Sequence, residues 1–342
     1  MRKHAAAAAS VVALCALVGC SSPAAKTAPK PSPTTTSSSS DDAADCLTGP
    51  GIMSACTRLG DLTTLDPCSL VTLGQLPPDL DASPKPRESL DYCAFDITAG
   101  PDKGAALNVG QLASTRQGPN GYGAGAQELP VAGLNLEQGE LGDGHCGDAV
   151  QFQGDLVDLQ IDVYAPNGSA GSQSLCDAAN EVGNALATVL GGKTQMQHFT
   201  VPKNSIAKLK ACSLLEGTQV GGYAVGGSAD SPSGHSCFWS PDMTNDNISL
   251  GVDLVIGPKL GSAMADSTSK IHGLDSYTFK DNESDYSRCE IDTDRAPWGS
   301  AGNGLVEIAE VSAVDDPGKA DAACTLATQM ANLAWPKLPA IS

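Results

Sequence analysis

Two histidines near cysteines are the residues whose types could support acid–base or metal chemistry. His145 lies between Asp143 and Asp148, so an imidazole and two carboxylates could share a proton or a metal ion. His235 also precedes a cysteine, but at a different place in the cysteine pattern. No pair of histidines is spaced as i and i+4, so ordinary loop residues are the simpler interpretation.

Three further patterns could carry chemistry. Residues 205–208 and 267–270 both read S-x-x-K, but no S-D-N or K-T-G element accompanies them. The acidic runs at 242–247 and 281–285 offer as many side-chain oxygen ligands as a calcium-binding loop. They lack the glycine and the distal glutamate of an EF-hand. Trp298 is the best candidate for an exposed, glycan-stacking aromatic, although packing is favoured. We therefore expect no catalytic residue, no metal site and no cofactor.

Eight cysteines form two sets of four with nearly the same spacing. The gaps are 25, 53 and 30 residues in the first set and 25, 52 and 35 in the second. Matching members lie 144, 144, 143 and 148 residues apart, which indicates a tandem duplication. The two sets are Cys68, Cys93, Cys146 and Cys176, and Cys212, Cys237, Cys289 and Cys324.

The number of cysteines predicts disulfides. Ten remain if Cys15 is removed with a signal segment and Cys20 is lipidated, and an even number is typical of exported disulfide-bonded proteins. Sequence alone does not give the connectivity, but duplicated copies should pair alike. We predict the pairs Cys46–Cys56, Cys68–Cys93, Cys146–Cys176, Cys212–Cys237 and Cys289–Cys324.

The residues around these cysteines predict the same elements twice. Asp66 and Pro67 are typical of a helix start, and apolar alternation over 157–163 predicts a half-buried antiparallel strand. Residues 248–256 repeat that alternation in the second copy, where Asp316 precedes a predicted terminal helix. The equivalent helix of the first copy carries an apolar stripe of Leu175, Ala179, Val182, Leu186 and Val189. We expect an α+β fold of two tandem disulfide-stapled domains, each a helix, an antiparallel meander and a helix.

The N-terminus predicts a lipoprotein signal. Two basic residues precede an apolar run over 5–18, which is too short to span a bilayer. The run ends in Leu-Val-Gly-Cys, where the small Gly19 permits cleavage and the thiol of Cys20 would accept diacylglycerol, the source of a palmitate label. An ordinary secretory signal is the alternative, and Cys15 is a poorer acceptor because a bulky leucine precedes it.

These features divide the chain into five predicted parts. They are a signal peptide at 1–19, the lipidated cysteine with a disordered Ser/Thr/Pro tether at 20–44, a first four-cysteine domain with its N-terminal clip at 45–192, a linker at 193–210 and a second four-cysteine domain at 211–342. The linker is locally basic and is interpreted as a solvated segment, or else as a docking surface for an acidic partner.

Composition limits the function classes. The formal net charge of −19 argues against a nucleic-acid partner, because phosphate binding requires a cationic face. A hydrophobic content of 41% with 17% charged residues argues against a wholly disordered chain. We expect a protein on the outer face of the cell membrane, anchored by lipid on Cys20.

The ordered motifs resemble a known family. D-P-C-S-L opens a helix, C-x-[FW] starts a strand and C-x-x-A opens the terminal helix, which is similar to the actinobacterial exported lipoproteins of domain of unknown function family 3558. The resemblance covers about residues 57–192 and 201–340. The first copy departs by having Phe95 where Trp239 stands in the second, and the second lacks the Asp-Pro before Cys212. The resemblance implies an exported lipoprotein and supplies no catalytic residue.

The sequence thus predicts a non-enzymatic envelope module. It would bind a small apolar ligand or an envelope protein, and the expected binding site is a cleft between its two domains. One alternative is an extracytoplasmic hydrolase that acts through His145, Asp143 and Asp148. The other is a passive surface spacer that binds nothing.

Overall fold

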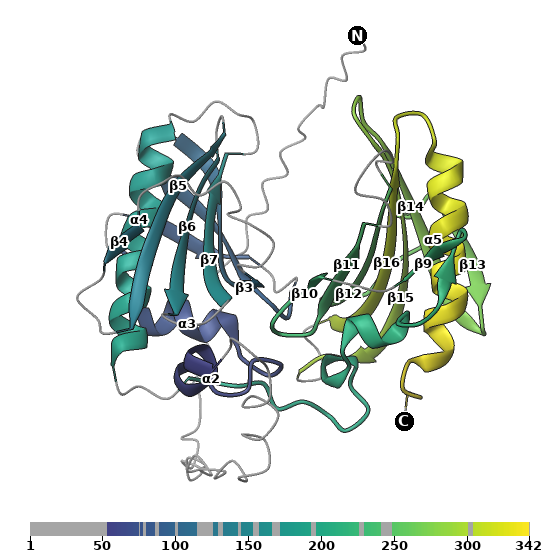
Figure 1. Cartoon of the computed structure of the whole chain (residues 1–342), viewed down its shortest axis with the longest axis horizontal. Helices are drawn as coiled ribbons and strands as arrows, with labels where there is room; N and C mark the ends of the chain where they lie inside the picture. Colours follow the sequence, from purple (N-terminus) through teal and green to yellow (C-terminus); the bar gives the residue numbers. More distant parts are fainter. Residues whose placement is uncertain are drawn as a thin grey trace, which may run out of the picture. The chain divides into compact units, whose positions relative to one another are not determined.

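The structure is a computed structural model in which residues 53–74, 76–77, 80–85, 89–99, 102–114, 126–128, 133–142, 145–152, 157–165, 172–192, 196–225, 229–240, 248–299 and 304–341 are described. The predicted signal peptide, Cys20, the tether and Cys46 lie outside these residues. The described chain is a mixture of helices and antiparallel strands, as expected (Figure 1).

The first half forms a seven-stranded sheet with the strand order β1-β2-β3-β7-β6-β5-β4. Its strands are β1 (Asp81–Pro84), β2 (Cys93–Ala99), β3 (Asp102–Ser114), β4 (Ala126–Glu128), β5 (Leu134–Gly142), β6 (His145–Phe152) and β7 (Val157–Tyr164). The helices described in this half are α2 (Met53–Leu59), α3 (Pro67–Gly74) and α4 (Ser172–Gly191).

The second half forms another seven-stranded sheet, and its order β10-β11-β12-β16-β15-β14-β13 repeats that of the first. Its strands are β10 (Ala229–Asp230), β11 (Ser236–Trp239), β12 (Ser249–Pro258), β13 (Ser267–Ile271), β14 (Leu274–Asn282), β15 (Ser287–Pro297) and β16 (Leu305–Asp315). The remaining elements are the hairpin β8 (Gln219–Val220) and β9 (Tyr223–Ala224), the helix α5 (Ala320–Ala334) and the 3₁₀ turns η2 (Ile206–Lys208), η3 (Ala211–Leu214) and η4 (Trp335–Lys337).

The strand order corrects the predicted meander. The chain leaves β3, enters the opposite edge of the sheet at β4 and returns through adjacent strands until β7 pairs with β3. The strand β7 is also not half-buried as predicted, because Asp158 and Gln160 are buried together with the apolar residues between them. The strand β7 lies at the centre of the sheet, where it is hydrogen-bonded to β3 on one side and to β6 on the other.

Helices cover one face of each sheet: α4 lies against the first together with α3, which packs on β3, and α5 lies against the second (Figure 1). The predicted apolar stripe of α4 does face the core, since Leu175, Ala179, Val182 and Leu186 are buried and Val189 is partly buried against the same core. In α5 the helix begins at Ala320 rather than at the predicted Asp316.

Four disulfides join these layers, and all four have the predicted pairing: Cys68–Cys93, Cys146–Cys176, Cys212–Cys237 and Cys289–Cys324. Two of them tie α4 and α5 to the strands β6 and β15. The predicted pair Cys46–Cys56 includes a residue outside the described part of the chain.

The two halves differ at their first helix. In the first half the Asp66 carboxylate accepts a hydrogen bond from the Cys68 backbone N–H at 3.0 Å and caps α3. The second half has Lys210 at the corresponding position, which makes no side-chain cap, and the chain forms only the short 3₁₀ turn η3. The predicted helix therefore shrinks to a single turn where the capping residue is missing.

The segment between the halves is partly packed rather than wholly solvated as predicted. Lys203, Lys208 and Lys210 are exposed, but Ser205, Ile206 and Ala207 are buried. Ser205 donates a hydrogen bond to the Glu307 carboxylate, and the Ile206 backbone N–H donates to its other oxygen at 3.2 Å. Lys193 lies outside the described residues.

A buried ion pair links the two halves of the chain. His235 is 1% exposed, and its Nδ1 lies 2.5 Å from an oxygen of Asp91. Its Nε2 lies 3.1 Å from the carbonyl oxygen of Ala207. Both ring nitrogens therefore face acceptors, an arrangement that only the doubly protonated imidazolium satisfies. Burial lowers the pKa of His235, but the charge and hydrogen bond of Asp91 outweigh burial and raise it overall.

We predict that Asp91→Asn destabilises the protein by about 3 kcal/mol, because it leaves a buried imidazolium without its countercharge. Chemical denaturation followed by tryptophan fluorescence measures this at pH 6. The effect should shrink as the pH rises through the raised pKa of His235, where the imidazolium is lost. The partly exposed pair of Lys85 and Asp96 is the control, and Asp96→Asn should cost less than about 1 kcal/mol. Equal losses for the two variants would contradict the assignment.

Candidate functional site

The second sheet carries a cluster of charged side chains on the face that points away from α5, here called the open face. Cys289 is bonded to α5, so the alternating residues Arg288, Glu290 and Asp292 of β15 point to the opposite side. Strand register then places Glu310 of β16 beside Asp292 and Asp253 of β12 beside Glu310. Three adjacent strands thus contribute four carboxylates and one guanidinium to the same surface.

The contacts within this cluster are close. The Arg288 guanidinium forms ion pairs with Glu290 and, at 3.0 Å, with Glu310. Carboxylate oxygens of Glu290, Asp292 and Glu310 lie within 4.8 Å of one another. The single guanidinium of Arg288 thus faces several carboxylates. The cluster has more acidic than basic groups, so binding of an additional positive charge is favoured.

Burial and mutual repulsion change how these acids titrate. Burial raises the pKa of Asp253 to about 6. Burial also raises the pKa values of Asp292 and Glu310, and the charge of Glu290 adds to the effect on both. Such raised values mean that a bound proton or another cation is favoured at this site.

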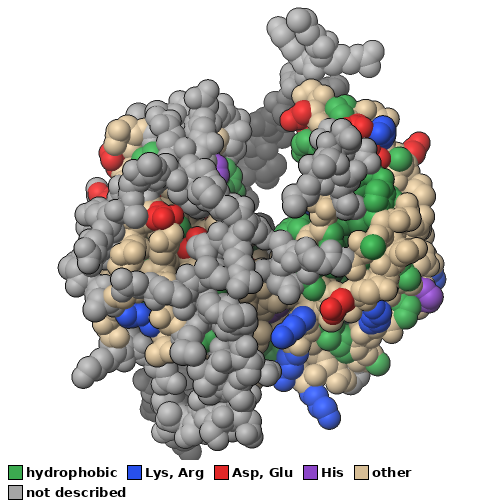
Figure 2. All heavy atoms as spheres, viewed as in Figure 1, with side chains coloured by type: hydrophobic (Ala, Val, Ile, Leu, Met, Phe, Trp, Pro, Cys, Tyr) green, Lys and Arg blue, Asp and Glu red, His purple; other side chains and the backbone are tan. Residues whose placement is uncertain are grey.

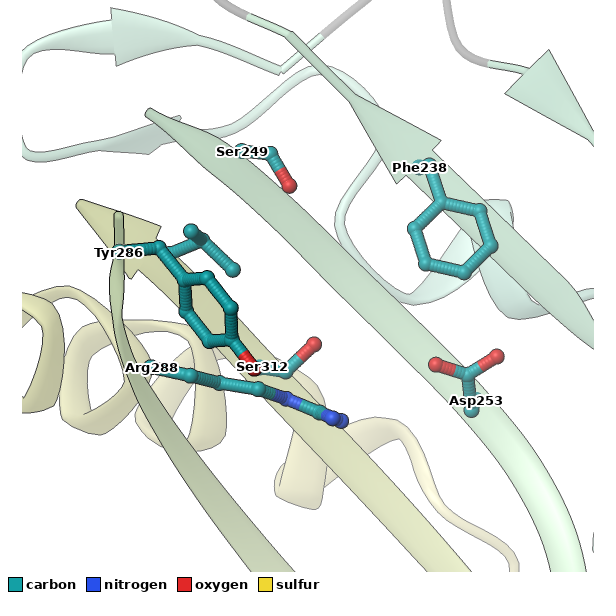
Figure 3. A pocket seen from close by; sticks show the side chains of 7 residues that line it. Phe238, Ser249, Asp253, Tyr286, Arg288 and Ser312 are labelled. Carbon is teal, nitrogen blue, oxygen red and sulfur yellow. The ribbon is translucent and has the colours of Figure 1, made fainter. Parts of the chain in front are cut away.

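A hollow of about 440 Å³ lies beside the cluster on the open face. Tyr286 and Arg288 lie along one side of it, and Phe238 and Asp253 lie on the other (Figure 3). The remaining lining residues are Ser249, Ser312 and Val314. An apolar ring and charged groups therefore border the same space, and all of its lining residues among the described part of the chain belong to the second half.

Apolar side chains reach the surface in this half. Figure 2 shows hydrophobic side chains gathered over the part of the molecule that contains the second sheet and α5. Among the described residues, the exposed large ones are Phe238 at 47%, Met264 at 74% and Ile341 at 54%. Of these, Phe238 borders the hollow.

The hypothetical cluster of His145, Asp143 and Asp148 is not assembled. His145 lies on the face of β6 opposite α4, where its Nε2 is 3.3 Å from the Asp162 carboxylate. Asp148 points the other way, since a Cβ built on Gly183 of α4 would lie 3.4 Å from its carboxylate. Asp143 lies outside the described residues. Residues three apart on a strand face opposite sides, which sequence proximity alone did not reveal.

The other motifs take structural positions. Ser205 of the first S-x-x-K is bonded to Glu307, and the second S-x-x-K lies on the exposed strand β13. Residues 281–285 are exposed at the end of a hairpin, and residues 242–247 lie outside the described chain. All three tryptophans are buried, and Trp298 packs edge-to-face on Phe199 with centroids 5.2 Å apart. The favoured prediction that Trp298 packs in the protein is therefore confirmed, and the alternative of an exposed, glycan-stacking aromatic is wrong for it.

Sequence reasoning missed the carboxylate cluster, although a signal was present. The run R-C-E-I-D at 288–292 alternates charged residues with residues that face the core, so Glu290 and Asp292 had to share a face. Glu310 could not be added to them without knowledge of the strand register.

No family model, no curated protein and no solved structure matches this chain. Within the described residues, no helix is both long enough and apolar enough to cross a bilayer.

Asp148 generates a prediction about pH. Its side chain is 0% exposed, both of its carboxylate oxygens lack a hydrogen-bond partner, and burial raises its pKa to about 7. The folded state therefore holds a proton that the unfolded chain has lost between its ordinary pKa of 3.8 and about pH 7. Folding stability should fall across this window, by at most about 1.4 kcal/mol per pH unit from this group.

We expect Asp148→Asn, which cannot ionise, to be more stable than the parent at pH 8 and to differ little from it at pH 4. Thermal unfolding measured at a series of pH values tests this expectation. Parallel stability curves for parent and variant would show that Asp148 does not titrate in this way.

Proposed function

We propose that the chain is a lipid-anchored envelope protein made of two tandem domains, and that the second domain binds a small, partly apolar molecule at the hollow on its open face. The repeated strand order and the matched disulfides support the tandem arrangement. The resemblance to the exported lipoprotein family and the Leu-Val-Gly-Cys motif support the anchor on Cys20.

The observation that carries the binding proposal is the position of Phe238. A phenylalanine exposed to 47% borders a hollow whose opposite side holds Tyr286 and Arg288. A ligand that covers the exposed half of this side chain would recover about 1 kcal/mol of hydrophobic free energy. Charged and hydroxyl groups around the ring would orient that ligand.

Comparison of the two halves supports a specific role for the second. The residue that corresponds to Phe238 in the first half is Ala94, since each follows the second cysteine of its set. The residue that corresponds to Arg288 is His145, since each precedes the third cysteine. The same strand order therefore persists without these side chains, so folding alone does not require them.

The anchor is tested by labelling living cells with a palmitate analogue. We expect Cys20→Ala to abolish incorporation of the label. Cys15→Ala is the matched control and should leave incorporation unchanged, because Cys15 would be removed with the signal peptide. Label that persists in Cys20→Ala and disappears in Cys15→Ala would reassign the acceptor.

The hollow is tested with the uncharged fluorophore Nile red, whose fused rings match Phe238 and which is not repelled by the carboxylates beside the hollow. The chain from Ser21 to Ser342 serves as the parent, because it lacks both the signal segment and the lipidated cysteine and needs no detergent. Adding Phe238→Ala should raise the Kd of the probe by roughly tenfold, as expected for the loss of one buried aromatic contact. Adding Met264→Ala, which removes a more exposed side chain outside the hollow, should leave the Kd unchanged. Equal effects of both substitutions would count against a binding site at Phe238.

A further inference from the structure

We propose that Glu290, Asp292 and Glu310 bind one hard divalent cation on the open face of the second sheet. This site goes beyond the proposed ligand at the hollow and requires no occupant there.

The geometry brings three carboxylates together from two strands. Glu290 and Asp292 are two residues apart on β15, and Glu310 is the register partner of Asp292 on β16. Oxygens of all three lie within 4.8 Å of one another. A cation placed among them could be bound by all three side chains, with small side-chain adjustments.

The surroundings of Asp292 are a second, independent reason to place a cation here. The residue is 5% exposed, and its Oδ1 is sealed from solvent without a hydrogen-bond partner. A buried carboxylate oxygen without a donor is costly, because neither water nor protein compensates for its lost hydration. A cation among the three carboxylates would provide that compensation.

Arg288 does not compensate the buried oxygen of Asp292. Its guanidinium forms ion pairs with Glu290 and Glu310, which leaves the Oδ1 of Asp292 unsatisfied. Asp253 adds a fourth carboxylate to the row through its register with Glu310. One guanidinium does not neutralise four carboxylates, so a divalent cation would balance part of the remaining negative charge.

The ligand atoms define the class of the cation. The three proposed ligands offer only carboxylate oxygens, which suit Ca²⁺, Mg²⁺ and Mn²⁺ and do not favour the softer ions that prefer imidazole or thiolate.

The first half provides an internal comparison. At the positions that correspond to Glu290 and Asp292 it has Gly147 and Ala149, and Ala149 pairs with Gln160 as Asp292 pairs with Glu310. The carboxylates are therefore an addition to a sheet that forms without them, as expected of a site and not of a folding requirement.

The test is a Tb³⁺ titration of the full chain in a non-ionic detergent. Tyr277 is the register partner of Asp292 on β14, so it is placed to sensitise the luminescence of an ion bound beside that residue. We expect saturable binding of one Tb³⁺ with displacement by Ca²⁺, Mg²⁺ or Mn²⁺. Asp292→Asn and Glu310→Gln should each weaken binding by about tenfold or more.

The controls are Asp281→Asn and Asp285→Asn, which remove the same charge from the exposed end of the β14–β15 hairpin and should leave the affinity unchanged. Glu290→Gln, at a more exposed position, gives a second reading if Asp292→Asn fails to fold. Absence of one-site binding at millimolar metal would overturn the proposal. So would binding that survives the substitutions in the cluster and is lost in the hairpin variants. Phe238→Ala should not alter Tb³⁺ binding, so failure of the ligand proposal would be distinguishable from failure of this one.

Discussion

The disulfide between Cys289 and Cys324 fixes which side of β15 faces α5, and the chemistry of the second sheet depends on that constraint. Because side chains alternate along a strand, residues flanking the cysteine must point away from the helix. A register shift of one residue would send Glu290 and Asp292 into the apolar layer beneath α5. The disulfide between Cys146 and Cys176 has the same effect in the first half, where His145 lies on the face of the sheet that points away from α4.

Sequence was sufficient wherever a local or duplicated pattern determined the structure. The cysteine spacing predicted four observed disulfides because two copies of one unit should pair alike. The apolar stripe beginning at Leu175 predicted the buried side of α4 because a helix repeats every 3.6 residues. Neither inference needed to know which strands are neighbours.

The parts of the fold and of the candidate site that the sequence did not predict depend on contacts between distant parts of the chain. Glu310 joins Asp292 only because β16 pairs with β15, and the predicted meander did not contain the crossing that creates the strand order. Nor does any local pattern indicate that His235 is paired with Asp91, since the two are 144 residues apart. Sequence proximity even misled, because His145 and Asp148 lie near each other in the chain and on opposite faces of one strand.

The pair of His235 and Asp91 has a consequence for how such a chain can evolve. Each residue stands two positions before the second cysteine of its set, so the contact joins equivalent positions of the two halves. In a symmetric homodimer, equivalent positions that meet on the two-fold axis must hold identical residues, and two acids or two imidazolium ions there would repel each other. Fusion of both copies into one polypeptide removes this restriction. Each half can then mutate separately, and an acid can meet a base where symmetry would have forbidden it.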